Sequence, residues 1–188
     1  MSAFEIEGGH RLHGEIQAQG AKNEALQILC ATLLTKDKVV VRNLPNILDV
    51  NNLISLMEDL GVKVEKLGKG SFSFEASDVD MDYLNTEDFF KKSASLRGSV
   101  MLVGPMVARF GKAIIPKPGG DKIGRRRLDT HFEGIHKLGA SFQYNADMQR
   151  YDIQAKGLKG CYMLLDEASV TGTANIVMAA VLAEGRTT

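Results

Sequence analysis

The chain repeats one pattern of predicted elements about every 75 residues, and this repeat limits its fold more than any other feature. Each unit starts with an apolar helix, continues through a strand and an amphipathic helix, and closes with a pair of strands. The first unit has these elements at residues 21–34, 38–42, 49–60, 62–64 and 71–74. The second has them at residues 96–109, 113–115, 128–138, 141–144 and 151–153. A third unit begins at Ser169, where residues 174–183 predict another apolar helix.

The glycines that follow the predicted helices set the period of the repeat. Gly111 and Gly185 are 74 residues apart, and Gly61 and Gly139 are 78 residues apart. The apolar helices carry hydrophobic residues on nearly every face, so neighbouring units must enclose them. The sequence therefore predicts an α/β (α+β) fold in which helices cover one side of each sheet.

The units are predicted at residues 21–95, 96–168 and 169–188, and the third is incomplete. The chain reaches Thr188 after only one helix of that unit. An unfinished unit should leave apolar surface exposed, because the elements that would cover it are missing. We therefore expect the chain to be part of a longer protein.

A basic, glycine-rich loop lies between the strand and the helix of the second unit, at residues 117–127. It has four cationic side chains within residues 122–127 and a single carboxylate, Asp121. Arginine and lysine in such a cluster bind phosphate or carboxylate oxygens, and the glycines free the backbone. This pattern predicts a phosphate-binding active-site lid, although a charged glycine-rich stretch is more often a solvated surface loop.

The starts of the three apolar helices resemble one another. Lys22 and Asn23 open the first, Arg97 holds the matching place 75 residues after Lys22, and residues 169–171 open the third. Backbone N–H groups at helix starts and nearby cations favour anions. If the units surround a common axis, these starts converge on one anionic ligand. In the alternative interpretation, Asn23 caps its helix and Lys22 points into solvent.

Composition excludes several other classes of protein. The formal net charge is zero, from 23 basic and 23 acidic residues, which argues against general binding to nucleic acid or to an anionic membrane. No segment has the length of a membrane span, and the acidic N-terminus does not fit a signal peptide. Cys30 and Cys161 have apolar neighbours and no metal-ligand spacing, so we expect buried thiols in a cytoplasmic protein.

Several motifs in order resemble the enolpyruvyl transferases that act on UDP-N-acetylglucosamine. They are Gly20-Ala21-Lys22-Asn23, Leu96-Arg97-Gly98-Ser99 with Gly104-Pro105, and the Pro118-Gly119-Gly120 loop followed by Asp129 and His131. The resemblance runs along the whole chain and is weaker to the enzymes that make 5-enolpyruvylshikimate 3-phosphate. It implies an inside-out α/β barrel of two lobes, each built from three units. Residues 21–188 would be the incomplete first lobe, and residues 1–20 a strand region bridging to the second.

The resemblance also implies roles for individual residues. Asp121, Lys22 and Arg97 would be catalytic, with phosphoenolpyruvate and UDP-N-acetylglucosamine as substrates and no cofactor or metal. The carboxylate that deprotonates the sugar 3-hydroxyl would lie in the second lobe, so this chain alone would be inactive. The residues expected to bind substrate are Lys22, Asn23, Arg97, Arg126, Arg127, Leu128, Asp129, His131, Ser169, Val170 and Thr171.

Asp121 stands where most members of that family have a cysteine on the loop. Both side chains carry one exchangeable proton, and their ordinary pKa values differ by about 4 to 5 units. The resemblance implies that this group protonates C3 of phosphoenolpyruvate, and that a carboxylate resists the epoxide antibiotic fosfomycin, which alkylates the thiol. A related transferase with another acceptor, or a non-catalytic anion-binding repeat module, are the alternative functions.

Overall fold

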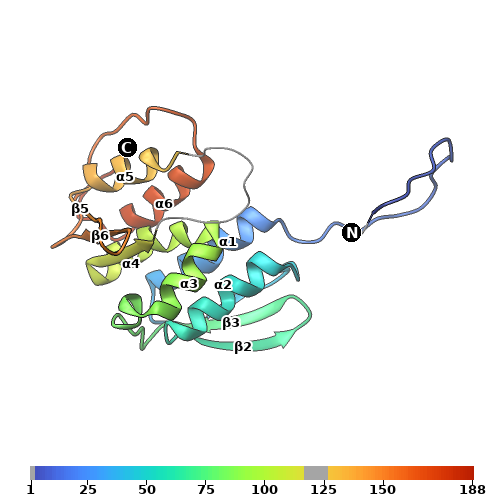
Figure 1. Ribbon diagram of the computed structural model, residues 1–188, viewed down its shortest axis with the longest axis horizontal. Coiled ribbons are helices and arrows are strands. Elements are labelled where there is room, and N and C mark those ends of the chain that lie inside the picture. The colour runs from blue at the N-terminus through green and yellow to red at the C-terminus, as the bar shows by residue number, and fades with distance from the viewer. Residues whose placement is uncertain (1–2, 117–126) are drawn as a thin grey trace.

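The computed structural model describes residues 3–116 and 127–188 of the chain (Figure 1). The first unit contains α1 (Lys22–Ala31), η1 (Thr32–Leu34), β1 (Val39–Val41), α2 (Leu48–Asp59), β2 (Lys63–Gly68), β3 (Ser71–Glu75), η2 (Tyr83–Asn85) and α3 (Glu87–Ser95). The second contains η3 (Arg97–Leu102), α4 (Val103–Phe110), β4 (Lys112–Pro116), α5 (Asp129–Lys137), β5 (Ser141–Asn145) and β6 (Arg150–Gln154). The third begins with α6 (Val170–Ala180).

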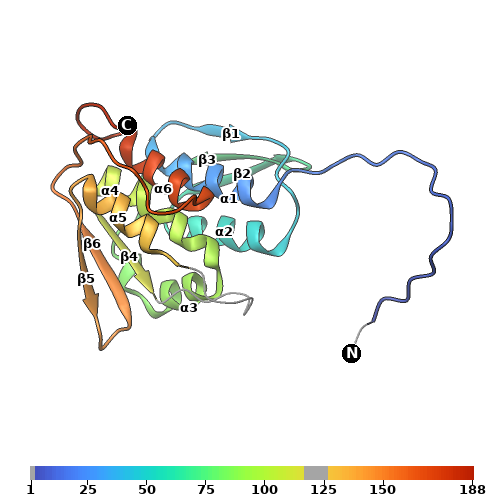
Figure 2. The same ribbon diagram turned by 90° about the horizontal axis from the view of Figure 1, so that it is seen from above.

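Each complete unit forms one three-stranded sheet with the same topology. The strand orders are β1-β3-β2 and β4-β6-β5, and every neighbouring pair is antiparallel. The two outer strands of each sheet therefore run parallel to each other, and α2 or α5 connects them. Figure 2 shows the two sheets lying apart on the outside of the helices. The predicted repeat is therefore confirmed, and the two units also share a strand order that the sequence did not predict.

The three apolar helices pack together at the centre of the molecule (Figure 1). Leu29 of α1, Leu33 of the following η1, Met106 of α4 and Ala179 of α6 are almost fully buried. Burying an aliphatic side chain of this size stabilises the fold by about 1.5–3 kcal/mol. The core therefore runs between the units through these helices, as the apolar faces predicted, and continues inside each unit, where Phe74 and Ile153 are fully buried.

Arg109 ties the first two units together from the end of α4. Its guanidinium donates to the backbone oxygens of Leu33 and Thr35, at 2.8 and 3.0 Å, and to that of Ala76. Burial lowers the pKa of Arg109 from its usual value. Gly111 ends α4 in the left-handed conformation, with φ of 68°, which glycine adopts without a steric penalty.

Several predicted details differ from the structure. Residues 97–102 form a 3-10 helix where an α-helix was expected, and α3 was not predicted. Asn23 is the second residue of α1 and does not cap it, because the N-cap position is Ala21. Cys30 is buried as expected, but Cys161 is partly exposed.

The segment before α1 forms no strand in the part of the chain that the structure describes. Residues 3–20 pair with no strand, and nearly all of them are exposed. Figure 1 shows the segment leading away from the helices. Its large apolar side chains Phe4, Ile6, Leu12 and Ile16 are each at least 87% exposed. The prediction that residues 1–20 bridge to a second lobe stays a prediction.

Candidate anion-binding site

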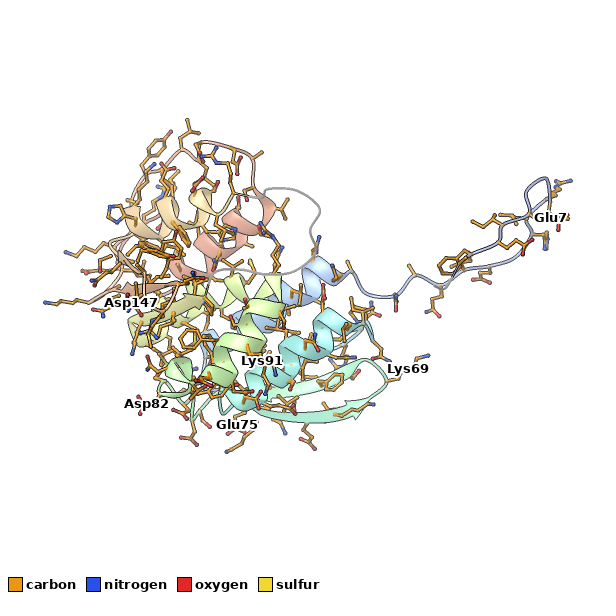
Figure 3. All side chains as sticks on the ribbon, viewed as in Figure 1. Glu7, Lys69, Glu75, Asp82, Lys91 and Asp147 are labelled. Atoms are coloured by element: carbon orange, nitrogen blue, oxygen red, sulfur yellow. The ribbon has the colours of Figure 1, made fainter. Side chains whose placement is uncertain are left out.

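The starts of the three central helices meet at one cavity of about 500 Å³. Side chains from all three units line it, as the similar helix starts predicted. Figure 3 shows other charged residues, such as Glu75, Asp82 and Asp147, pointing outward at the periphery. The residues predicted from sequence that line the cavity are Lys22, Asn23, Arg97, Arg127, Leu128, His131, Ser169 and Thr171.

Two described residues that the sequence predicted for the site, Val170 and Asp129, do not line this cavity. The side chain of Val170 is on the outer surface and 76% exposed. Asp129 lies at the start of α5, where its carboxylate accepts from Arg127 Nε at 2.6 Å. Asp121 and Arg126 fall outside the described residues.

Lys22 is held by a carboxylate that the sequence did not single out. Lys22 Nζ donates to Asp49 Oδ2 at 2.9 Å, and Asp49 lies in the first turn of α2. A lysine at a helix start opposes the helix dipole, and Asp49 supplies the compensating charge. Both side chains are roughly half exposed, so the pair contributes little to stability, typically about 0–1 kcal/mol. Lys22 therefore remains able to bind an incoming anion.

Arg127 and the segment before α6 also line the cavity. Arg127 pairs with Asp129 and, at 3.3 Å, with Asp166. Its hydrogen bond and ion pair with Asp129 raise the pKa of Arg127, so the guanidinium stays charged. Thr130 Oγ1 donates towards Asp166 and Glu167 at 3.3 and 3.2 Å.

Ser169 caps α6 at the edge of the cavity. Its hydroxyl oxygen accepts from the backbone N–H of Gly172 at 3.1 Å. This leaves the hydroxyl hydrogen of Ser169 able to bond an acceptor in the cavity. The helix start adds a partial positive charge at the same place.

His131 is the most deeply buried titratable group of the site, with 2% of its surface exposed. Its Nε2 lies 3.2 Å from Thr171 Oγ1, and its Nδ1 lies 3.1 Å from Asn175 Nδ2. Burial, helped by the positive charge of Arg97, lowers the pKa of His131 to about 4. The imidazole is therefore neutral at neutral pH and acts through hydrogen bonds.

The charges of the site suit an anion. Three cationic side chains line the cavity, Lys22, Arg97 and Arg127, and two carboxylates, Asp49 and Glu167, so positive charge is in excess.

Within residues 3–116 and 127–188, no group of three His, Cys, Asp or Glu side chains is placed to hold a metal ion. Nor does any described helix have the length and hydropathy that crossing a membrane requires.

A family model described as EPSP synthase (3-phosphoshikimate 1-carboxyvinyltransferase) matches residues 6–188. The chain belongs to the EPSP synthase family. The match covers both complete units and the start of the third.

Relatives within the EPSP synthase family are close in sequence. A Bacteroides fragilis protein named UDP-N-acetylglucosamine 1-carboxyvinyltransferase is 70% identical over 188 residues, which are all of this chain and 43% of that protein. Proteins of the same name from Porphyromonas gingivalis and Borreliella burgdorferi are 63% and 43% identical. The resemblance predicted from the motifs is confirmed. The chain spans less than half the length of the curated relatives it matches.

Solved structures of the EPSP synthase fold agree with the architecture. The enolpyruvyl transferase NikO from Streptomyces tendae has a TM-score of 0.74 at 20% identity and matches 95% of this chain and 41% of its own. EPSP synthase from Acinetobacter baumannii has a TM-score of 0.66 at 17% identity, covering 93% of this chain and 39% of its own. The predicted fold class, that of the enolpyruvyl transferases, is confirmed.

Proposed function

We propose that the intact protein carrying this chain transfers the enolpyruvyl group of phosphoenolpyruvate to the 3-hydroxyl of UDP-N-acetylglucosamine and releases phosphate. The observation that carries this proposal is the convergence of three equivalent helix starts on one cationic cavity. Both substrates are polyanions, and the relatives' names point to the same acceptor. The reaction would be the first committed step of peptidoglycan synthesis, in the cytoplasm.

The cavity offers different groups to the two substrates. Lys22 and Arg97 lie at the starts of the first and second units and suit the phosphate and carboxylate of phosphoenolpyruvate. Arg127, Ser169 and Thr171 supply a guanidinium and two hydroxyls to the same cavity, which suit a diphosphate. Asn23 offers both a donor and an acceptor to the sugar.

The chemistry is an addition followed by an elimination. The sugar 3-hydroxyl gives its proton to the carboxylate expected in the second lobe, its oxygen bonds to C2 of phosphoenolpyruvate, and C3 gains a proton. C3 then loses a proton, the bond from C2 to the phosphate oxygen breaks, and phosphate leaves. Fixed cations stabilise the charge that develops on the phosphate, which is a large contribution in a site closed to water. Asp121, on the loop outside the described residues, is the proposed proton donor to C3.

Phosphate release by the intact protein tests this function. With phosphoenolpyruvate, UDP-N-acetylglucosamine should support release and shikimate 3-phosphate should not. Arg97→Met should lower kcat/KM by about 100-fold or more because it removes a charge-assisted contact. Lys38→Met is the matched control, since Lys38 pairs with Glu65 on the sheet and does not line the cavity.

Each alternative function predicts a different result in the same assay. A related transferase would release phosphate only with another acceptor, such as shikimate 3-phosphate. A non-catalytic anion-binding module would bind UDP-N-acetylglucosamine in calorimetry and release no phosphate with any acceptor. Either result would contradict the proposed reaction.

A further inference from the structure

Asn175 connects three elements beneath the candidate site. It lies in α6 with no exposed surface. Its Oδ1 accepts from the backbone N–H of Gly104 at 2.7 Å, and its Nδ2 donates to the backbone oxygen of Val100 at 3.0 Å. The same Nδ2 lies 3.1 Å from His131 Nδ1 on α5.

The two backbone partners decide which way the Asn175 amide faces. A backbone N–H can only donate and a backbone carbonyl can only accept, so the oxygen must face Gly104 and the nitrogen must face Val100. The reversed amide would lose both of these buried hydrogen bonds. Asn175 therefore presents an N–H, and not an oxygen, to His131.

This orientation sets the position of the proton on His131. Because Asn175 donates to Nδ1, Nδ1 must be the unprotonated nitrogen, and the neutral ring carries its proton on Nε2. Nε2–H then donates to Thr171 Oγ1 at 3.2 Å. The contact uses the oxygen of Thr171 as an acceptor, which leaves its hydroxyl hydrogen for an acceptor in the cavity that Thr171 lines.

Gly104 makes this arrangement possible. A Cβ atom at residue 104 would overlap both the backbone oxygen and Oδ1 of Asn175. The Gly104-Pro105 pair is therefore the place where α6 approaches the start of α4. From the sequence, this pair had no predicted role in binding an anion. A side chain there would push Asn175 away from His131.

We propose that Asn175 is a positioning residue: it holds His131 as the Nε2–H tautomer, and His131 in turn directs the Thr171 hydroxyl hydrogen at an acceptor oxygen of the bound sugar nucleotide. The ligand part of this inference rests on the proposed function. The tautomer part does not, because it follows from the buried hydrogen bonds alone. Asn175 itself touches no ligand in this account.

The first test is the tautomer of His131 in the intact protein labelled with ¹⁵N-histidine. A spectrum of the unmodified protein at neutral pH should show an unprotonated Nδ1 and a protonated Nε2. Loss of the resonances in His131→Gln assigns them. In Asn175→Asp a carboxylate faces Nδ1, and both ring nitrogens should become protonated. An Nδ1–H tautomer in the unmodified protein, or an unchanged spectrum in Asn175→Asp, would overturn the inference.

The second test is binding of UDP-N-acetylglucosamine by calorimetry. Thr171→Val and His131→Leu should each weaken binding by about tenfold, and the double variant should be no weaker than the single ones, because both act through one hydroxyl. Asn175→Asp keeps the proton on Nε2 and should not weaken binding. Thr32→Val is the control, since it removes a buried hydrogen bond, from Thr32 Oγ1 to Leu29 O, within the first unit and outside the cavity lining. Additive losses would contradict the inference. Absence of binding by the unmodified protein would contradict the proposed function, and the spectrum would still decide the tautomer.

Discussion

Burial of His131 makes the stability of the protein depend on pH. Its pKa is about 4 in the folded chain and about 6.5 when unfolded. Between these values the unfolded state binds a proton that the folded state does not, so stability falls as pH falls from about 6.5 to about 4. The protonation of His131 in the unfolded state lowers the free energy of unfolding by at most about 3 kcal/mol. Above pH 6.5 this group causes no loss.

The matching experiment follows urea unfolding of the intact protein from pH 7 to pH 4. His131→Gln should flatten the fall in the free energy of unfolding over this range, even if it lowers stability throughout. His136→Gln is the control, because His136 lies on the exposed side of the same helix. Equal slopes in all three proteins would contradict the neutral, buried His131.

Asp121 leads to a prediction that comes from the sequence alone. A carboxyl proton donor should favour a more acidic pH for catalysis than a thiol, because the ordinary pKa of aspartate is about 4 to 5 units lower. Asp121→Cys should move the optimum of phosphate release upward. It should also create sensitivity to fosfomycin, read as a covalent adduct by mass spectrometry. Identical optima, or an adduct on Asp121 itself, would contradict this role.

At the level of residues, the sequence predicted the cations and hydroxyls of the site better than their partners. Lys22, Arg97 and Thr171 stand out because each opens an apolar helix. Asp49 and Asn175 do not stand out, because each contacts a residue far away in the sequence: Asp49 contacts Lys22 within the first unit, and Asn175 contacts Val100 of the second. An acid in the first turn of a helix and an asparagine inside an apolar helix were the available signals.

At the level of elements, the close packing of α5 on α6 forms one wall of the site. A Cβ at Gly134 would overlap Cδ1 and Cγ1 of Ile176. Gly134→Ala should therefore destabilise the protein by about 1–3 kcal/mol, although alanine is the better helix former.

Removing the obstructing side chain should reverse the sign of this effect. In an Ile176→Ala background the clash is gone, so Gly134→Ala should be neutral or stabilising by up to about 1 kcal/mol. Thermal unfolding of the four proteins of this cycle gives both values. A Gly134→Ala effect that is the same in the two backgrounds would show that the contact does not limit the packing.

Elements with strong periodicity were predicted within a few residues, and the exceptions have local causes. Helix α3 is only nine residues long and its large apolar residues are two adjacent phenylalanines, so its sequence shows little helical spacing of hydrophobic residues. Its start was readable, because Thr86 accepts from the N–H of Phe89 and acids fill the first turn. Residues 97–102 could not be assigned as a 3-10 helix, because nothing in hydrophobic spacing separates that helix from an α-helix at this length.

At the scale of the whole molecule, the repeat predicted both the two similar sheets and the convergence of helix starts. Each unit buries its apolar helix against the others, so the site exists only when the units are assembled. Spacing could not give the strand order, because β3 and β6 reach the middle of their sheets through tertiary pairing. Exposed apolar residues on α6, Val170 and Val177, fit the expected uncovered surface of the third unit.

The most direct test of the account takes one residue from each unit. Lys22→Met, Arg97→Met and Thr171→Val in the intact protein should each lower kcat/KM for enolpyruvyl transfer to UDP-N-acetylglucosamine, by about tenfold for Thr171 and about 100-fold for the cations, while unfolding temperatures stay close to that of the unmodified protein. Losses from all three units would show that they serve one site. Full activity in any one of the three variants would contradict the convergence on which the proposed function depends.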